Sequence, residues 1–254
     1  MSLHHIPETP SVPAAMARAL EHALDAEPRR VQAVKVSGQV VWVKQAEQLS
    51  LRWRLQKGDT RRAFEADRAG LHVLGEAGLP VPPILAEGPD FFVVPDVGKT
   101  LAALLLDPQE AGPARMAAFV AAGQALANLH KARVCHGRPS IRDICWDGTT
   151  ARMIDFERFV PGPRAMRDMA LDVIVFHYSI LTYGRGETSE LAAAAAAYRA
   201  AAPEGVWQAA RARVARLRWL APVARLAQRI KPRSWELRAV PMVITFFARP
   251  RGAA

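Results

Sequence analysis

The pattern of apolar and polar residues changes along the chain, from short strand-like runs in the first third to long helical runs in the rest. Apolar residues on both sides of a Ser37-Gly38 turn predict a strand pair over Val31–Val36 and Gln39–Lys44. The periodicity of the same third predicts two helices and one more strand: Val12–Asp25, Arg61–Ala77 and Phe91–Val94. The first third is therefore predicted to hold most of the β structure.

Beyond residue 100 the apolar positions recur with helical spacing. The predicted helices are Leu101–Leu106, Pro113–Arg133, Met166–Thr182, Leu191–Ala202 and Val206–Ile230. One predicted β-hairpin interrupts them, with Ile144–Trp146 and Ala151–Ile154 on the two sides of an Asp147-Gly148 turn. Strands followed by helices predict an α+β fold in two parts, one small and β-rich, the other mostly helical.

The natural boundary between the two parts is the Pro-Asp-Val-Gly connector at residues 95–98. We expect four segments along the chain. They are an N-terminal extension over 1–29 with a loose start at 1–11, a β-rich lobe over 30–97, a helical lobe over 98–247 and a polar tail over 248–254.

Two acidic residues flank the predicted hairpin, Asp143 before its first strand and Asp155 after its second. A hairpin brings its two ends together, so both carboxylates should face one point in space. Paired carboxylates suit Mg²⁺, a hard cation that prefers oxygen ligands and bridges nucleotide phosphates. An ordinary surface hairpin with exposed acids at its base is the other interpretation of this segment taken alone.

Four short motifs follow one another in the chain: the strand Val40–Lys44, the Gly78–Pro82 run after a helix, the loop His136–Asp143 and the run Ile154–Glu157. Together they resemble the protein-kinase-like superfamily, most closely the bacterial lipopolysaccharide (Kdo/WaaP-type) kinases. The resemblance implies a two-lobed protein-kinase-like fold and an ATP-dependent phosphotransferase that uses Mg²⁺. It also implies an anionic sugar or glycolipid acceptor, whose hydroxyl receives the γ-phosphate.

The same resemblance implies which residues bind the nucleotide. Lys44 would contact the phosphates and would need a carboxylate on the following helix to hold it. Asp67 is the expected partner because it shares a helix face with Leu71 and Leu74, and Glu65 is the alternative. The backbone groups expected to bind adenine are those of Pro95, Asp96 and Val97.

The loop departs from the family at its catalytic position. Kinases have His-x-Asp here, whereas this chain has His136, Gly137 and Arg138, and Asp143 stands where Asn is usual. A guanidinium cannot accept the proton of an acceptor hydroxyl. Two interpretations stay open. In the first, Asp143 orients the hydroxyl and Arg138 binds phosphate; in the second, the chain is a pseudokinase that binds a nucleotide or a protein partner.

Neighbouring residues are expected to support the loop. His136 should bond the backbone near Asp155, and one of two acids on the following helix, Asp168 or Asp172, should accept hydrogen bonds from the loop backbone. The remaining histidines in the body of the chain are isolated and lack metal-ligand spacing, so no histidine metal site is expected: His72, His130 and His177.

The chain is strongly basic, with a net charge of +10 and a pI near 10.4, which favours anionic partners. The predicted helix Val206–Ile230 is rich in arginine and amphipathic. Two readings of it stay open: it lies on an anionic membrane surface, or it packs on the lobe and exposes a solvated arginine face. Nucleic acid is not expected, because no aromatic stacking platform accompanies the charge.

The cysteines and the N-terminal residues bear on the compartment. Cys135 and Cys145 form neither a disulfide framework nor a Cys-x-x-Cys pair, and the first residues lack the basic and apolar regions of a signal peptide. We therefore expect a cytoplasmic protein, peripheral on the inner face of the cytoplasmic membrane if the basic helix binds lipid.

Overall fold

The computed structural model describes residues 14–25, 29–46 and 60–249. The expected loose start at 1–11 and the end of the tail at 250–254 lie outside the described residues. Contacts divide the chain into two units, the first over Met1–Val97 and the second over Gly98–Ala254. Phe156–Arg158 is the exception, because this short segment groups with the first unit.

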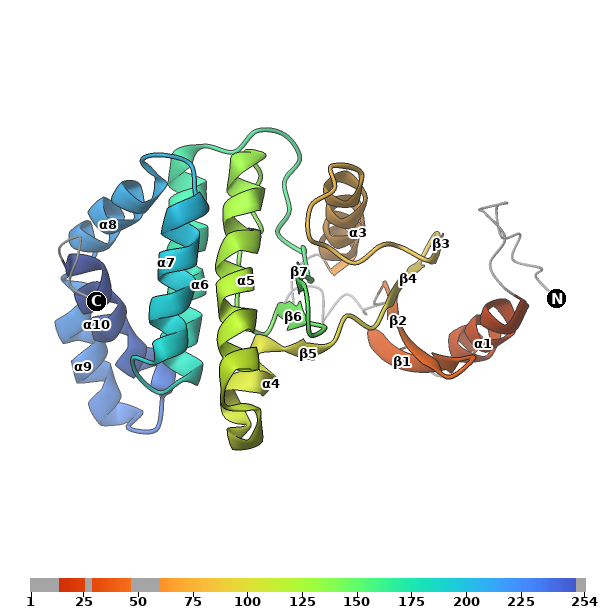
Figure 1. The fold of residues 1–254 in the computed structure, drawn as a ribbon, viewed down its shortest axis with the longest axis horizontal. Helices are drawn as coiled ribbons and strands as arrows, with labels where there is room; N and C mark the ends of the chain where they lie inside the picture. The colour runs from red at the N-terminus through yellow and green to blue at the C-terminus, as the bar shows by residue number, and fades with distance from the viewer. Residues whose placement is uncertain (1–13, 26–28, 47–59, 250–254) are drawn as a thin grey trace. The chain divides into compact units, whose positions relative to one another are not determined.

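The first unit is built on a four-stranded antiparallel sheet in the order β1-β2-β4-β3 (Figure 1). Its strands are β1 (Val31–Val36), β2 (Gln39–Gln45), β3 (Ala86–Gly88) and β4 (Phe91–Pro95), and its described helices are α1 (Ala14–Asp25) and α3 (Thr60–Glu76). Along β2 the side chains alternate, with Val41 and Val43 buried and Trp42 exposed. The two valines join Leu20 of α1 in one apolar cluster, which is why α1 packs on this sheet.

The second unit is mostly helical. A small sheet in the order β5-β6-β7 is formed by β5 (Lys99–Thr100), β6 (Ile144–Trp146) and β7 (Ala151–Met153). The helices are α4 (Leu101–Leu106), α5 (Pro113–Lys131), α6 (Met166–Tyr183), α7 (Ser189–Ala201), α8 (Val206–Arg216), α9 (Leu220–Ile230) and α10 (Trp235–Ala248), with a short 3-10 turn at Pro108–Glu110. The predicted α+β class is thus confirmed, as are the strand pair and the hairpin between residues 144 and 153.

The predicted single helix over Val206–Ile230 is wrong, because two helices, α8 and α9, occupy this range. Pro222 gives the physical reason. In a continuous helix its ring would clash with the carbonyl of Arg218 and it would donate no hydrogen bond, whereas in the first turn of a new helix neither cost arises. Helix α10 was not predicted, and Pro241 inside it obscures the helical pattern. Among the described helices, none is long and apolar enough to cross a membrane.

Helices α5 and α7 lie side by side and approach closely at Gly123 (Figure 1). A Cβ atom built on this glycine would overlap the carbonyl oxygen of Ala194 and come within 3.1 Å of the backbone nitrogen of Tyr198. Both obstacles are backbone atoms, which cannot move aside as a flexible side chain would. The packing of the two helices therefore depends on a missing side chain at position 123.

We predict that Gly123→Ala destabilises the protein, although alanine is the better helix former by about 1 kcal/mol. Overpacking costs about 1–3 kcal/mol, and a clash with backbone atoms places this site at the upper end, so a net loss of about 1–2 kcal/mol should lower the melting temperature by roughly 2–8 °C. Gly75→Ala in α3 is the matched control, because its new Cβ would meet only Val81 Cγ2, at 3.9 Å. Thermal unfolding checks the pair, and equal melting temperatures for the two variants would contradict the prediction.

Candidate active site

The first unit holds a buried ion pair between a strand and a helix. Lys44 on β2 places its Nζ 2.5 Å from Oδ2 of Asp67 on α3, and both side chains are largely buried. The second oxygen of Asp67, Oδ1, accepts the backbone N–H of Phe156 at 2.8 Å. Each oxygen of this buried carboxylate therefore has a donor, as a charge removed from water requires.

The structure distinguishes the two carboxylates that were candidates for Lys44. Asp67 lies on the buried face of α3 with Leu71 and Leu74. Glu65 instead bonds Arg68 through its Oε2 and lies 3.3 Å from Arg61 Nε through its Oε1. The helical wheel indicated the correct partner, because only the buried acid needed a buried cation.

In the connector between the units, few backbone N–H groups could donate a hydrogen bond to adenine. Pro95 has no N–H, and the N–H of Asp96 donates to the carbonyl of Val40 at 3.1 Å. The side chain of Asp96 also accepts a bond from Trp42 Nε1, at 3.3 Å. Of the three residues predicted here, only Val97 is left to supply an N–H donor to a ligand.

The second unit holds the two acids at the base of the β6–β7 hairpin. Asp143 precedes β6 and Asp155 follows β7, and the N–H of Ile154 donates to the carbonyl of Asp143 at 2.9 Å. The last rung of the hairpin therefore lies directly beside both acids. Burial, and then the negative charge of Asp155, raise the pKa of Asp143 from 3.8 to about 6, although Arg138 and Arg142 act in the opposite direction.

The backbone of Asp155 is left-handed, with φ of 69°. Few residues other than glycine adopt this conformation, although Asp and Asn do so more readily than most. Such backbone outliers gather at active sites and ligand clamps. The raised pKa of one acid and the backbone of the other thus both mark this hairpin base as a candidate site.

Arg138 lies against one of the two acids. Its Nη2 is 3.4 Å from Oδ2 of Asp155, and its side chain is 47% exposed. The sequence suggested that Arg138 would bind phosphate; in the structure its partner is a carboxylate predicted to bind metal. The guanidinium and a cation would therefore compete for Asp155.

His136 lies behind the loop and is almost completely buried. Its Nε2 is 2.9 Å from the carbonyl oxygen of Ile154, and its Nδ1 is 3.4 Å from the N–H of Arg138. With the proton on Nε2, the ring donates to the first group and accepts from the second. His136, which opens the kinase-like loop motif, thus contacts backbone on both sides, which is a positioning role.

Asp172 on α6 holds the start of the same loop. Its Oδ2 accepts the N–H of His136 at 2.7 Å, and its Oδ1 accepts the N–H of Gly137 at 3.0 Å. Asp168, the other candidate for this role, pairs with Arg164 at 3.0 Å. Asp172 is therefore the acid that orients the loop.

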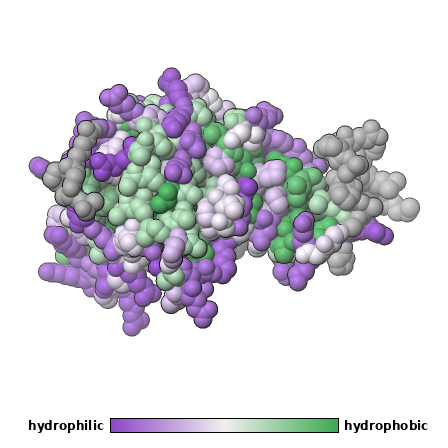
Figure 2. Space-filling model, in the orientation of Figure 1, coloured by the Kyte–Doolittle hydropathy of each residue, from purple (hydrophilic) through white to green (hydrophobic). Residues whose placement is uncertain are grey.

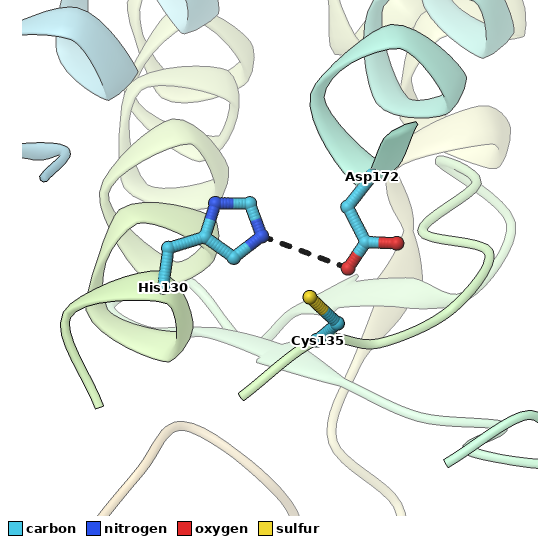
Figure 3. Close-up of side chains that lie close together, drawn as sticks. All are labelled: His130, Cys135 and Asp172. Carbon is cyan, nitrogen blue, oxygen red and sulfur yellow. Dashed lines mark ion pairs between the residues drawn. The ribbon is translucent and has the colours of Figure 1, made fainter. Parts of the chain in front are cut away.

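A buried cluster forms around Asp172, as Figure 3 shows. His130 Nε2 is 3.6 Å from Asp172 Oδ2, its Nδ1 is 2.7 Å from the hydroxyl of Tyr198, and Cys135 completes the group. The sequence analysis treated His130 as isolated, and this was wrong. The three residues come from the end of α5, from the loop and from α6, so no spacing motif marks them.

The cluster has donor atoms of the kinds that bind metals, but its electrostatics favour another role. Both oxygens of Asp172 already accept backbone N–H groups. Burial and the charge of Asp172 raise the pKa of the Cys135 thiol far above its usual range. Because metals bind the thiolate, this cysteine is a poor ligand. We interpret the cluster as support for the loop.

No family model matches the chain. A protein of Haemophilus influenzae described as uncharacterized is 33% identical over 128 residues, covering 50% of this chain and 53% of that protein. The chain thus spans about half the length of the curated relative that it matches.

One solved structure with some similarity is that of the bifunctional kinase-methyltransferase WbdD. It has 15% sequence identity and a TM-score of 0.44, and the match covers 69% of this chain and 44% of that one.

We predict that Asp143→Asn stabilises the protein at neutral pH. The folded state raises the pKa of Asp143, so it holds this proton more tightly than the unfolded state does. The corresponding stability is complete below about pH 4 and is lost as the pH rises through about 6. At pH 7.5 the uncharged variant should gain roughly 1–2 kcal/mol, less than the full shift implies because solvent screens a partly exposed group.

Melting temperatures of wild type and variant across this pH range check the prediction. The variant should melt about 2–8 °C higher at pH 7.5 and converge with wild type near pH 4. Asp168→Asn serves as the control, since that acid is already paired with Arg164 and should gain nothing. A lower melting temperature for Asp143→Asn at pH 7.5 would rule out the electrostatic account.

Proposed function

We propose that this chain is an ATP-dependent phosphotransferase of the lipopolysaccharide-kinase-like group, which transfers the γ-phosphate to a hydroxyl of a sugar or lipid-linked sugar. One observation carries the proposal. Asp143 and Asp155 lie together at the hairpin base, and burial with mutual repulsion raises the pKa of Asp143. Acids held together at such a cost are typical of sites that act on a ligand.

The donor set fits a magnesium ion. Two carboxylates are hard oxygen ligands, and a cation between them would relieve the repulsion that the pKa of Asp143 reports. In this proposal Asp143 and Asp155 hold the ion, which would neutralise charge on the phosphates. Lys44, fixed by Asp67, would contact the phosphates, and Val97 would be the N–H donor to adenine.

Asp143 also has the properties that Arg138 lacks. A general base must be able to accept a proton, which a carboxylate can do and a guanidinium cannot. Asp143 would accept the proton of the acceptor hydroxyl as the new oxygen–phosphorus bond forms. The bond from the γ-phosphorus to the bridging oxygen breaks, and ADP leaves with the electron pair. The protein needs few other catalytic groups, because phosphoryl transfer depends mainly on the positioning of the reactants and on charge.

One contact favours a second candidate, a pseudokinase that binds a nucleotide or a protein partner. Arg138 reaches Asp155 at 3.4 Å, so a fixed positive charge lies where the metal would bind. A guanidinium stays protonated at any physiological pH. If this ion pair persists with nucleotide present, the fold is unchanged but Asp155 does not bind a metal ion.

We predict that Asp155→Asn abolishes Mg²⁺-dependent nucleotide binding. Asparagine tolerates the left-handed backbone at this position, so the loop should stay in place while the metal loses a charged ligand. Wild type at ten times its Kd for MgATP should be stabilised by about 1.4 kcal/mol, and the variant should not. Thermal shifts with MgATP, and with ATP plus EDTA, measure both.

Asp168→Asn is the matched control, with the same chemical change on an acid outside the pair, and should respond as wild type does. Lys44 is unsuitable for this test because its removal leaves Asp67 buried without its cation. No MgATP stabilisation of wild type at millimolar ATP would argue against an active enzyme and leave a partner-binding pseudokinase.

Substitutions at Arg138 separate the two candidates. If Arg138 assists phosphate, Arg138→Ala should slow ATP turnover and weaken nucleotide binding. Arg138→Asp adds a third carboxylate beside Asp143 and Asp155, so it should disturb metal binding and not raise turnover. The double change Arg138→Asp with Asp143→Asn restores the usual kinase pair and should recover activity lost in the single change.

Steady-state ATP turnover by each purified variant distinguishes the active enzyme from the pseudokinase. A general base is worth on the order of 10²–10⁴-fold in rate, so restoring one where it had been lost would be obvious. Turnover by Arg138→Asp alone that far exceeds wild type would identify Arg138 as a disabling substitution and the natural chain as a pseudokinase.

A further inference from the structure

Helices α8 and α9 bury their apolar residues to very different extents. Helix α8 packs against α6 and α10 and buries Val206 and Val214. Helix α9 contacts α10, yet among its residues Ala224 alone is buried. Val223, Leu226 and Ile230 of α9 are thus left on the surface.

Together with Trp219, the N-cap residue of the helix, they form a single row, which we call the α9 row: Trp219, Val223, Leu226 and Ile230. Their spacing of four, three and four residues places them on one side of the helix. Between 51% and 83% of each is exposed, and Ile230 is the most exposed. Scattered apolar residues on a surface need no explanation, whereas four aligned on one helix indicate an interaction site.

The charges around the α9 row all have the same sign. No acidic residue occurs between Glu204 and Glu236, whereas the same stretch has eight basic ones. Arg211 and Arg213 are used within the fold, since they bond the carbonyls of Phe247 and Arg167. Six are exposed, and none of these pairs with a carboxylate in the described part of the chain: Arg216, Arg218, Arg225, Arg229, Lys231 and Arg233.

The basic residues lie beside the α9 row. At 3.6 residues per turn, Arg229 lies about 90° around the helix from the α9 row and Arg225 about 130°, both on the flank away from Ala224, which packs inward. Hydrophilic side chains project from the lower left of the surface in Figure 2, the region of α9 in Figure 1. An apolar row with basic flanks is the pattern of a helix that lies in the interface of an anionic bilayer.

We propose that α9 is a membrane-docking helix, whose apolar row inserts among the lipids of an anionic phospholipid bilayer while its basic flank contacts the headgroups. The charge complementarity favours this occupant over a second copy of the chain, because two such faces would bring twelve positive charges together, six from each copy. The sequence suggested the whole range Val206–Ile230; the structure restricts the surface to α9 and its immediate neighbours. The proposal does not depend on the phosphotransferase activity.

Flotation of the purified protein with vesicles tests this docking. Vesicles that contain phosphatidylserine or phosphatidylglycerol should bind wild type, and pure phosphatidylcholine vesicles should bind it at least tenfold more weakly. Binding should fall as salt rises from about 0.05 M to about 0.5 M, because salt screens the charges. Excess inorganic phosphate should not compete, since it offers the row no apolar surface.

Two double variants separate the two parts of the surface. Leu226→Ser with Ile230→Ser should weaken binding at least tenfold at every salt concentration, because the apolar contact is lost. Arg225→Gln with Arg229→Gln should also weaken it about tenfold or more, but only at low salt, since each basic residue contributes roughly fivefold.

Matched controls change the same residue types elsewhere on the surface. Leu106→Ser with Val160→Ser replaces two exposed apolar residues, and Lys131→Gln with Arg167→Gln removes two exposed charges. Both should bind as wild type does. Equal binding to neutral and anionic vesicles, or none to either, would overturn the proposal. So would a wild-type dimer that fails to bind vesicles and dissociates on Leu226→Ser with Ile230→Ser, because the row would then be a self-association surface.

Discussion

The loop that carries Arg138 and leads to Asp143 depends on one buried carboxylate. Asp172 accepts the N–H groups of His136 and Gly137, and the ring of His136 reaches on to the backbone beside Asp155. Short polar contacts in a dry interior are directional and expensive to break, so they fix a segment that has no regular hydrogen bonding of its own. The positions of Arg138 and Asp155 therefore depend on these contacts.

The fold holds two like charges close together in the candidate site. Asp143 and Asp155 repel each other, and Arg138 offsets part of that repulsion through its contact with Asp155. Arg138 therefore has two effects. It is a counterion that stabilises the acid pair, and it competes with any metal ion for Asp155. The buried carboxylate of the first unit is neutralised without a ligand, because Lys44 forms an ion pair with Asp67.

Local sequence patterns predicted much of the fold and of the candidate site. A turn between apolar runs predicted the hairpin, and therefore the meeting of two acids, while the helical face of Asp67 indicated its partner. The end of α8 was missed, because periodicity alone ignores the clash of Pro222 with a carbonyl four residues earlier. The grouping of His130, Cys135 and Asp172 was missed for a deeper reason. It arises only when the fold brings the end of α5, the loop after it and α6 to one point, and nothing in the spacing of the three residues records that meeting.

The left-handed backbone of Asp155 also bears on how such a site can be lost. The residues that best tolerate this conformation are glycine, asparagine and aspartate itself. An aspartate codon becomes an asparagine or a glycine codon by a single base change. Genetic drift can therefore remove this carboxylate in one step with little disturbance of the loop, so a lineage could pass from enzyme to binding protein while its fold is preserved.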